Sequence, residues 1–321
     1  MIGDEWHLSQ RIGSGLATIL GSASPGDGVF VIGVNFGDHA EVWKSNDWGE
    51  TFSYVQTLAG VTEIRCIALC AGVLMAGTWP DGGVWYGGPS GSAWTRMGGL
   101  PGAAYCQCLL QQGGALLAGS GTNGSIFTSS DGGVTWSLLN HVTTYYVYDM
   151  LFTSSGSLIA ICSTGIFRSV NGGATFTRVS TQYCGNVLEL STGTLLAGHN
   201  GAFVVRSVND GLTWVRSSAI ASITRVDSIT ETQDGIILLC GSSNGWICRS
   251  TNDGLTFAPV VKLGSQDDPP TSNLTSYCIF HMGGERCLAP SSAFGRIFKS
   301  GPIPVVIPRF HPEWKFRFGP L

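Results

Sequence analysis

One short pattern recurs along this chain of 321 residues and constrains its fold more than any other feature. Its clearest copy, IFTSSDGGVTW, begins at Ile126, and further copies begin at Val42, Ile166, Val204 and Ile247. A worn copy around Gly87 and an incomplete copy at Ile297 bring the total to seven, at intervals of 38 to 50 residues. A repeat of this length is typical of the four-stranded blades of β-propellers.

A second column of residues supports the same period. Upstream of each turn, a short apolar stretch such as LMAG or LLAG contains one small residue: Ala76, Ala118, Ala160, Ala197, Cys240 and Ala289. A narrow side chain at one depth of every blade suits the close packing of neighbouring sheets.

The two ends of the chain complement each other. The last copy of the repeat stops after Ser300, and the segment Gly3–Trp6 matches the missing end of the repeat in its glycine and its aromatic residue. We therefore expect a strand at about residues 5–12 to complete the blade that begins near Ser276, which leaves no sheet edge open. The predicted fold is all-β: a single seven-bladed β-propeller of four-stranded blades in residues 1–300, followed by an extended C-terminal arm in residues 301–321.

The polar residues of the repeat are predicted to build turns. Ser, Asp and Asn side chains bond to backbone amides a few residues further on, and glycine reaches positive φ without strain. The predicted turn residues are Asp47, Asp131, Asn171, Asn209 and Asn252, with Gly49, Gly133, Gly173, Gly211 and Gly254. Because a turn uses their polar atoms, we interpret them, and Asp253 beside them, as structural and not catalytic.

The pattern Ser-x-Asp-x-Gly-x-Thr-Trp resembles the Asp-box, or BNR repeat. This repeat occurs in sialidases, xyloglucan-cleaving glycoside hydrolases, the sortilin group, photosystem assembly factors and many phage and surface proteins. The resemblance extends from about Trp6 to Ser300 and implies propeller hairpins at the blade rim, away from any central site. It implies no particular activity, because a fold does not determine a function.

Composition argues against several classes of function. Only 12% of the residues are charged and the net charge is −4, which gives no electrostatic basis for binding nucleic acid. The chain has no apolar run of 18 residues, so no membrane insertion is expected, and its start, MIGDEWHLSQ, lacks the features of a signal peptide. The ten cysteines lie mostly in apolar segments and the six histidines do not cluster. We expect a chain that folds in a reducing cytoplasm, with no metal and no other cofactor.

No group of residues in the sequence predicts an enzyme. Arg168, Arg206 and Arg249 stand beside the turns and belong to the repeat, so they do not indicate the arginine cluster of a sialidase. Four acids early in the blades could pair for glycoside hydrolysis if they face a common end of the ring: Glu63, Asp149, Glu189 and Asp227. Solvated or turn-bonded acids are the simpler interpretation, and no catalytic residue is predicted. The tyrosine-rich stretch HVTTYYVY from His141 suits contact with sugar or protein, although core packing is the simpler account.

The C-terminal segment GPIPVVIPRFHPEWKFRFGPL departs from the repeat. Its prolines favour an extended chain, and its predicted docking residues are Arg309, Phe310, Trp314, Phe316 and Phe318. The arm either packs on its own propeller or docks on a partner subunit as an extended peptide, and we favour the partner.

These features predict a non-enzymatic structural or interaction protein of a large assembly, with other protein subunits as its partners. A phage virion component, in the tail, neck, fibre or capsid decoration, fits the low charge, the reduced cysteines and the lack of an export signal. Two alternatives stay open: a carbohydrate-binding or glycoside-hydrolysing propeller with a glycan ligand, and an assembly chaperone similar to the photosystem factors.

Overall fold

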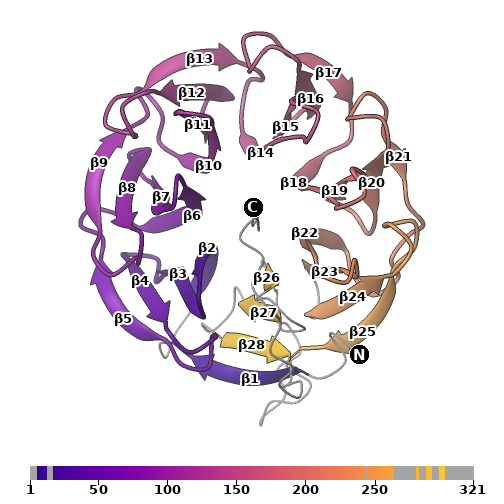
Figure 1. The fold of residues 1–321 in the computed structure, drawn as a ribbon, viewed down its shortest axis with the longest axis horizontal. Coiled ribbons are helices and arrows are strands. Elements are labelled where there is room, and N and C mark those ends of the chain that lie inside the picture. The colour runs from indigo at the N-terminus through magenta and orange to yellow at the C-terminus, as the bar shows by residue number, and fades with distance from the viewer. Residues whose placement is uncertain are drawn as a thin grey trace.

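Four-stranded antiparallel sheets arranged around a central axis make up the protein (Figure 1). The computed structural model describes residues 6–12, 17–242, 245–263, 280–281, 287–290 and 296–300. All regular elements in these ranges are β-strands. The described residues contain no helix that is long and apolar enough to cross a membrane. The all-β prediction is therefore confirmed for the described part of the chain.

Six of the sheets are continuous blades, each made of four consecutive strands with the first strand nearest the axis (Figure 1). Blade 1 consists of β2 (Thr18–Gly26), β3 (Val29–Asn35), β4 (Ala40–Ser45) and β5 (Ser53–Thr57). Blade 2 consists of β6 (Glu63–Cys70), β7 (Val73–Trp79), β8 (Gly83–Gly88) and β9 (Thr95–Gly99). Blade 3 consists of β10 (Cys106–Gln112), β11 (Ala115–Ser120), β12 (Ser125–Ser129) and β13 (Ser137–His141).

The second half of the ring repeats this arrangement. Blade 4 consists of β14 (Val147–Phe152), β15 (Leu158–Cys162), β16 (Gly165–Ser169) and β17 (Thr177–Ser180). Blade 5 consists of β18 (Cys184–Glu189), β19 (Leu195–His199), β20 (Val204–Ser207) and β21 (Val215–Arg216). Blade 6 consists of β22 (Arg225–Glu231), β23 (Ile237–Ser242), β24 (Trp246–Ser250) and β25 (Ala258–Lys262).

The remaining sheet, which we call the closing sheet, joins the two ends of the chain. Its order is β1 (Trp6–Arg11), β28 (Arg296–Ser300), β27 (Cys287–Pro290) and β26 (Phe280–His281). Strand β1 pairs antiparallel with β28, from Trp6 opposite Ser300 to Arg11 opposite Arg296. The expectation of a seven-bladed propeller is wrong: six blades are continuous, and the closing sheet is a composite in which β1 pairs with β28 from the other end of the described chain.

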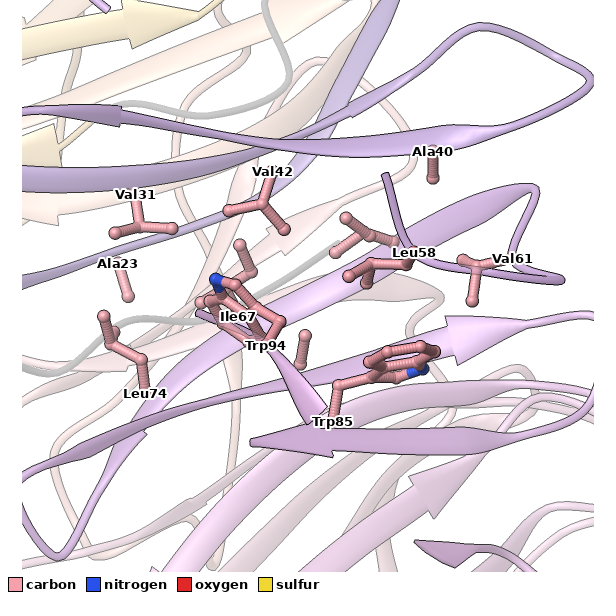
Figure 2. Packing of buried hydrophobic residues seen from close by; sticks show 12 residues of the cluster. Ala23, Val31, Ala40, Val42, Leu58, Val61, Ile67, Leu74, Trp85 and Trp94 are labelled. Carbon is pink, nitrogen blue, oxygen red and sulfur yellow. The ribbon is translucent and has the colours of Figure 1, made fainter. Parts of the chain in front are cut away.

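The core lies between neighbouring blades. Figure 2 shows apolar side chains of blades 1 and 2 meeting between their sheets, with Val31 and Val42 on one side and Ile67, Leu74 and Trp85 on the other. These side chains are at most 6% exposed. Burial of large apolar side chains in every seam is the main stabilising contribution to such a ring.

The predicted column of small residues lies in these seams. Ala76, Ala118, Ala160, Ala197 and Cys240 are completely buried. The glycine that follows Ala76 approaches the next blade even more closely, because a Cβ atom added to Gly77 would lie 2.6 Å from the carbonyl oxygen of Cys106. The eight cysteines from Cys66 to Cys248 are buried and form no disulfide.

Candidate functional site

The innermost strands of the six blades share one irregularity. Each contains a β-bulge, where the pairing register with the second strand skips one residue. The skipped residues are Leu20, Arg65, Gln107, Tyr148, Gly185 and Asp227. A bulged residue has no ladder partner and is turned away from the regular pleat, which is why bulges often aim side chains into functional sites.

All six bulged residues line one cavity at the hub of the ring. The cavity has a volume of about 300 Å³, and its other lining residues are Tyr183, Cys184, Asn200, Arg225 and Val226. The six positions are equivalent in the repeat but carry an apolar, a cationic, an amide, a phenolic, a glycyl and an anionic residue. The regular frame therefore surrounds the cavity with groups of different chemistry.

The charged groups at the hub form ion pairs. Arg225 donates from Nε to a carboxylate oxygen of Asp227, whose side chain is completely buried. Arg65 lies 2.9 Å from Glu63 through Nη1 and also stacks over the Tyr105 ring, 5.0 Å from its centroid. Because an opposite charge compensates each of these charges, the cavity is polar without a strong net field.

An arc of aromatic rings runs beside the cavity across blades 2 to 5. Trp79 stacks on Tyr105 at a centroid distance of 5.7 Å, and Tyr146 stacks on Tyr148 at 5.5 Å. The arc ends at Tyr183, whose hydroxyl lies 2.7 Å from that of Tyr148. Burial raises the pKa of Tyr148, and its hydrogen bond to Tyr183 adds to this effect. Of the HVTTYYVY stretch, Tyr148 thus lines the hub cavity and Tyr146 stacks on it.

Gln107 of β10 carries a buried amide that is incompletely bonded. The residue is 3% exposed, and its Oε1 atom accepts no hydrogen bond from the described residues. Buried polar atoms without a partner are uncommon in native proteins, and each requires an explanation. The side chain of Gln107 lines the hub cavity, so a ligand in that cavity would explain the unpartnered oxygen.

The four acids considered for hydrolysis do not converge. Asp149 is buried in the seam between blades 4 and 5, where its carboxylate accepts hydrogen bonds from Met150 N and Val187 N at 2.8 and 2.9 Å. Burial raises the pKa of Asp149 well above its usual value, and the two hydrogen bonds offset only part of this rise. Glu189 stands at the far end of β18 and accepts hydrogen bonds from the backbone N and Oγ of Ser154. Only Asp227 is among the described residues that line the cavity, so the expectation of a common end does not hold for all four.

The five turn acids and amides lie between the third and fourth strands of their blades. In blade 3, Asp131 accepts hydrogen bonds from Ser129 Oγ at 2.7 Å, Thr135 N at 2.9 Å and Thr135 Oγ1 at 2.6 Å. Asp47, Asn171, Asn209 and Asn252 accept the equivalent bonds from the serine hydroxyl and the threonine backbone N of their own blades. Towards the threonine hydroxyl the direction differs: Asp47 accepts from it, and the three asparagines donate to it from Nδ2. The glycines that follow at 49, 133, 173, 211 and 254 all have positive φ.

Two acids beside the turns connect neighbouring blades. Arg168 of blade 4 donates from Nε to the carbonyl oxygen of Asp210 in blade 5 at 2.7 Å, and its Nη2 contacts the Asp210 carboxylate. Arg206 of blade 5 binds Asp253 of blade 6 in the same way. Two of the three arginines assigned to the repeat, Arg168 and Arg206, therefore bind the neighbouring repeat, which the sequence of a single repeat does not indicate.

The predicted docking residues Arg309, Phe310, Trp314, Phe316 and Phe318 lie outside the described residues. Within the described part of the chain, no group of three His, Cys, Asp or Glu side chains is placed to hold a metal ion.

Sequence reasoning missed the hub residues, although a signal for them exists. Each copy has one small residue, such as Ala118 or Cys240, and the bulged residue lies 12 to 14 positions before the residue that comes directly after it. Gln107 precedes Gly119 in this way, and Asp227 precedes Gly241. In a chain of similar copies, this is a position where the residue type changes in every copy. Such variation inside a conserved frame indicates a place where the repeat is not serving packing.

No protein-family model matches this sequence, and no curated protein matches it. Several solved structures of β-propellers are similar to it in fold. Catalytically inactive virginiamycin B lyase from Staphylococcus aureus with quinupristin has a TM-score of 0.74 at 13% identity, over 93% of this chain and 100% of the other. YCF48 bound to D1 peptide has a TM-score of 0.72 at 14% identity, over 93% and 97%. The WD40 β-propeller domain of Doa1 has a TM-score of 0.67 at 13% identity, over 94% and 97%. At these identities the likeness shows the β-propeller fold and no more.

Proposed function

We propose that this protein is a non-enzymatic binding propeller that holds an extended segment of a partner protein at its hub cavity. One observation carries the proposal: the same bulge in six successive inner strands places six different residues, five of them with side chains, around one cavity. A pocket with a few polar groups on a rigid frame selects its ligand by the pattern of hydrogen bonds that it offers.

The charges at the hub support binding over hydrolysis. A glycoside hydrolase uses two carboxyl groups on either side of the scissile bond. Among the described residues that line the cavity, Asp227 is the single acid, and it is ion-paired with Arg225. A lone, paired carboxylate suits the recognition of a ligand better than acid–base chemistry.

The aromatic arc supports a peptide ligand over a sugar. Sugar rings stack on open aromatic faces, whereas Trp79 faces Tyr105 and Tyr146 faces Tyr148. The peptide bound to YCF48 supports the proposal at the level of the fold, because it is one case of this architecture carrying a peptide.

The proposal includes the setting that the sequence favours. The partner would be another subunit of a large assembly, of which a phage virion is the predicted example, and the turns would be Asp-boxes in the sense of the BNR repeat. The C-terminal arm would be a second contact with that assembly. Identification of the chains that accompany this protein in its native particle tests this setting directly.

Binding at the hub is tested by presenting the purified chain with a library of displayed peptides and, in parallel, with a glycan array. We expect selected peptides to bind and Tyr183→Ala to weaken their binding by about tenfold, because Tyr183 lines the cavity. Tyr145→Ala is the matched control, since Tyr145 is 61% exposed and does not line the cavity. Binding of glycans alone, or equal losses in the two variants, would contradict the proposal.

A further inference from the structure

Two glutamines of this protein show how it binds a peptide group. Gln56 of blade 1 donates from Nε2 to the carbonyl oxygen of Trp94 at 2.9 Å and accepts from the backbone N of the same residue at 3.0 Å. Gln10 of β1 donates to the carbonyl oxygen of Phe52 at 3.0 Å and accepts from the Phe52 amide. In both cases one side-chain amide pairs with the N–H and the C=O of a residue at the start of an outer strand.

Gln107 offers the same amide to the hub cavity. It is the bulged residue of β10, it is 3% exposed, and its Oε1 atom has no hydrogen-bond donor among the described residues. The bulge fixes the backbone of Gln107, and the buried flanking cysteines Cys106 and Cys108 hold the strand in the core. The backbone that carries the amide is therefore fixed, and Oε1 has no donor among the described residues.

We infer that Gln107 pairs with the backbone amide of an extended peptide segment inserted into the hub, in the way that Gln10 and Gln56 pair with Phe52 and Trp94. The inference rests on the proposed function and names the group that recognises the peptide. The acceptor Oε1 takes the peptide N–H, and Nε2 donates to the C=O of the same residue.

The surroundings define the kind of segment that fits. The cavity of about 300 Å³ is at the lower end of the range of ligand pockets, so it accommodates a loop tip or a chain end and not a folded domain. The Arg65–Glu63 and Arg225–Asp227 pairs leave the hub without a dominant charge. A neutral segment, recognised through its backbone and through the hydroxyls of Tyr148 and Tyr183, matches this lining.

The test uses the full chain and a peptide selected for binding to it. A set of variants of that peptide carries an ester in place of one amide at each position, which removes one N–H donor at a time. We expect one ester position to raise the Kd about tenfold, and Gln107→Met to raise the Kd of the unmodified peptide by a similar factor. The two changes together should cost no more than Gln107→Met alone, because the ester removes one of the two hydrogen bonds that the substitution already removes.

Gln112→Met is the matched control, because Gln112 lies on the same strand and is exposed. It should leave the Kd and every ester effect unchanged. Thermal unfolding gives a second measurement: Gln107→Met should be at least as stable as the natural chain, because it removes a buried polar atom that lacks a partner. A clear loss of stability would show that Gln107 serves the fold, and would overturn the inference.

Two failures are distinguishable. If peptides bind but Gln107→Met and the ester series act additively, the amide contact is wrong and the proposed peptide-binding function stands. If no peptide binds the natural chain, the proposed function is wrong and the inference falls with it.

Discussion

At the scale of single residues, the five turns show one role filled by two chemical groups. Asp47 and Asp131 accept hydrogen bonds from the threonine four residues on, and Asn171, Asn209 and Asn252 accept the equivalent bond from theirs. Only the two acids can titrate. The blades therefore contain a natural comparison between a turn that depends on pH and one that does not.

We predict that Asp131→Asn reduces the loss of stability in acid. Hydrogen bonds from the side chain and backbone of Thr135 hold the pKa of Asp131 below its usual value of 3.8. Since the folded pKa is lowered, the stabilisation is fully present above the unfolded pKa and is lost as the pH falls through the folded pKa. Urea unfolding at pH 7 and pH 3 should show a smaller decline for the variant than for the natural chain.

The reverse change provides the control for this prediction. Asn171→Asp places a carboxylate in an equivalent turn and should make that turn sensitive to acid, with a gain at neutral pH. Equal declines in stability for Asp131→Asn and the natural chain would show that the carboxylate contributes nothing particular to the turn.

At the scale of elements, the distance between neighbouring sheets is set by the smallest residues. Strand β7 approaches blade 3 so closely that a Cβ atom at Gly77 would lie 2.6 Å from the carbonyl oxygen and from Sγ of Cys106. Backbone atoms of a paired strand cannot move aside without disturbing the ladder. The glycine therefore fixes how closely blades 2 and 3 pack.

We predict that Gly77→Ala destabilises the protein by about 1–3 kcal/mol, the usual range for overpacking a core. Gly114→Ala is the control, because a Cβ atom at Gly114 has no heavy atom within 4 Å. Replacement there should be neutral or stabilising by less than about 1 kcal/mol. Chemical denaturation of both variants provides the measurement, and similar stabilities of the two would contradict the close approach.

The period of the elements could be predicted from the sequence because each turn is a local structure. Ser129, Asp131 and Gly133 bond within one short segment, so their spacing alone specifies a hairpin. The small column was also visible, because Ala76, Ala118 and Ala160 repeat the same packing requirement. The contact of Arg168 with Asp210 could not be predicted in this way, because it joins residues 42 positions apart in different copies.

The hub could not be predicted for a related reason. Its position follows from bulges, which are a property of strand pairing and not of a local sequence pattern. The residues at the bulges also differ in type from blade to blade. Leu20, Arg65, Gln107, Tyr148 and Asp227 share no chemistry that a repeat could display. The turns are therefore clear in the sequence, whereas the cavity of the proposed site is hidden in it.

At the scale of the whole molecule, the ring depends on a joint between residues far apart in the chain. The pairing of β1 with β28 connects positions 6–11 with positions 296–300. Gln10 of the same strand reaches further and binds the backbone of Phe52 in blade 1. One short N-terminal strand thus holds both the last strands of the chain and the first blade.

We predict that removal of residues 1–11 destabilises the whole ring and not only its end. The deletion removes the five paired positions of β1 and both hydrogen bonds of Gln10, a loss of about 7 kcal/mol if each contributes about 1 kcal/mol. Because the blades pack on one another, thermal unfolding should stay a single transition and shift down by on the order of 10 °C. The exposed edge of β28 should also promote pairing between molecules, which sedimentation velocity would detect.

Addition of a peptide of residues 1–12 to the truncated chain separates the joint from other effects of the deletion. We expect this peptide to restore the unfolding temperature and the monomer, and a version with Gln10→Ala to restore less, because it pairs with β28 but cannot bind Phe52. Gln56→Ala in the full chain removes the equivalent contact at Trp94 without touching the joint. It should lower stability by about 1–3 kcal/mol without oligomer formation. An unchanged unfolding temperature in the truncated chain would contradict the role of β1 as the strand that completes the ring.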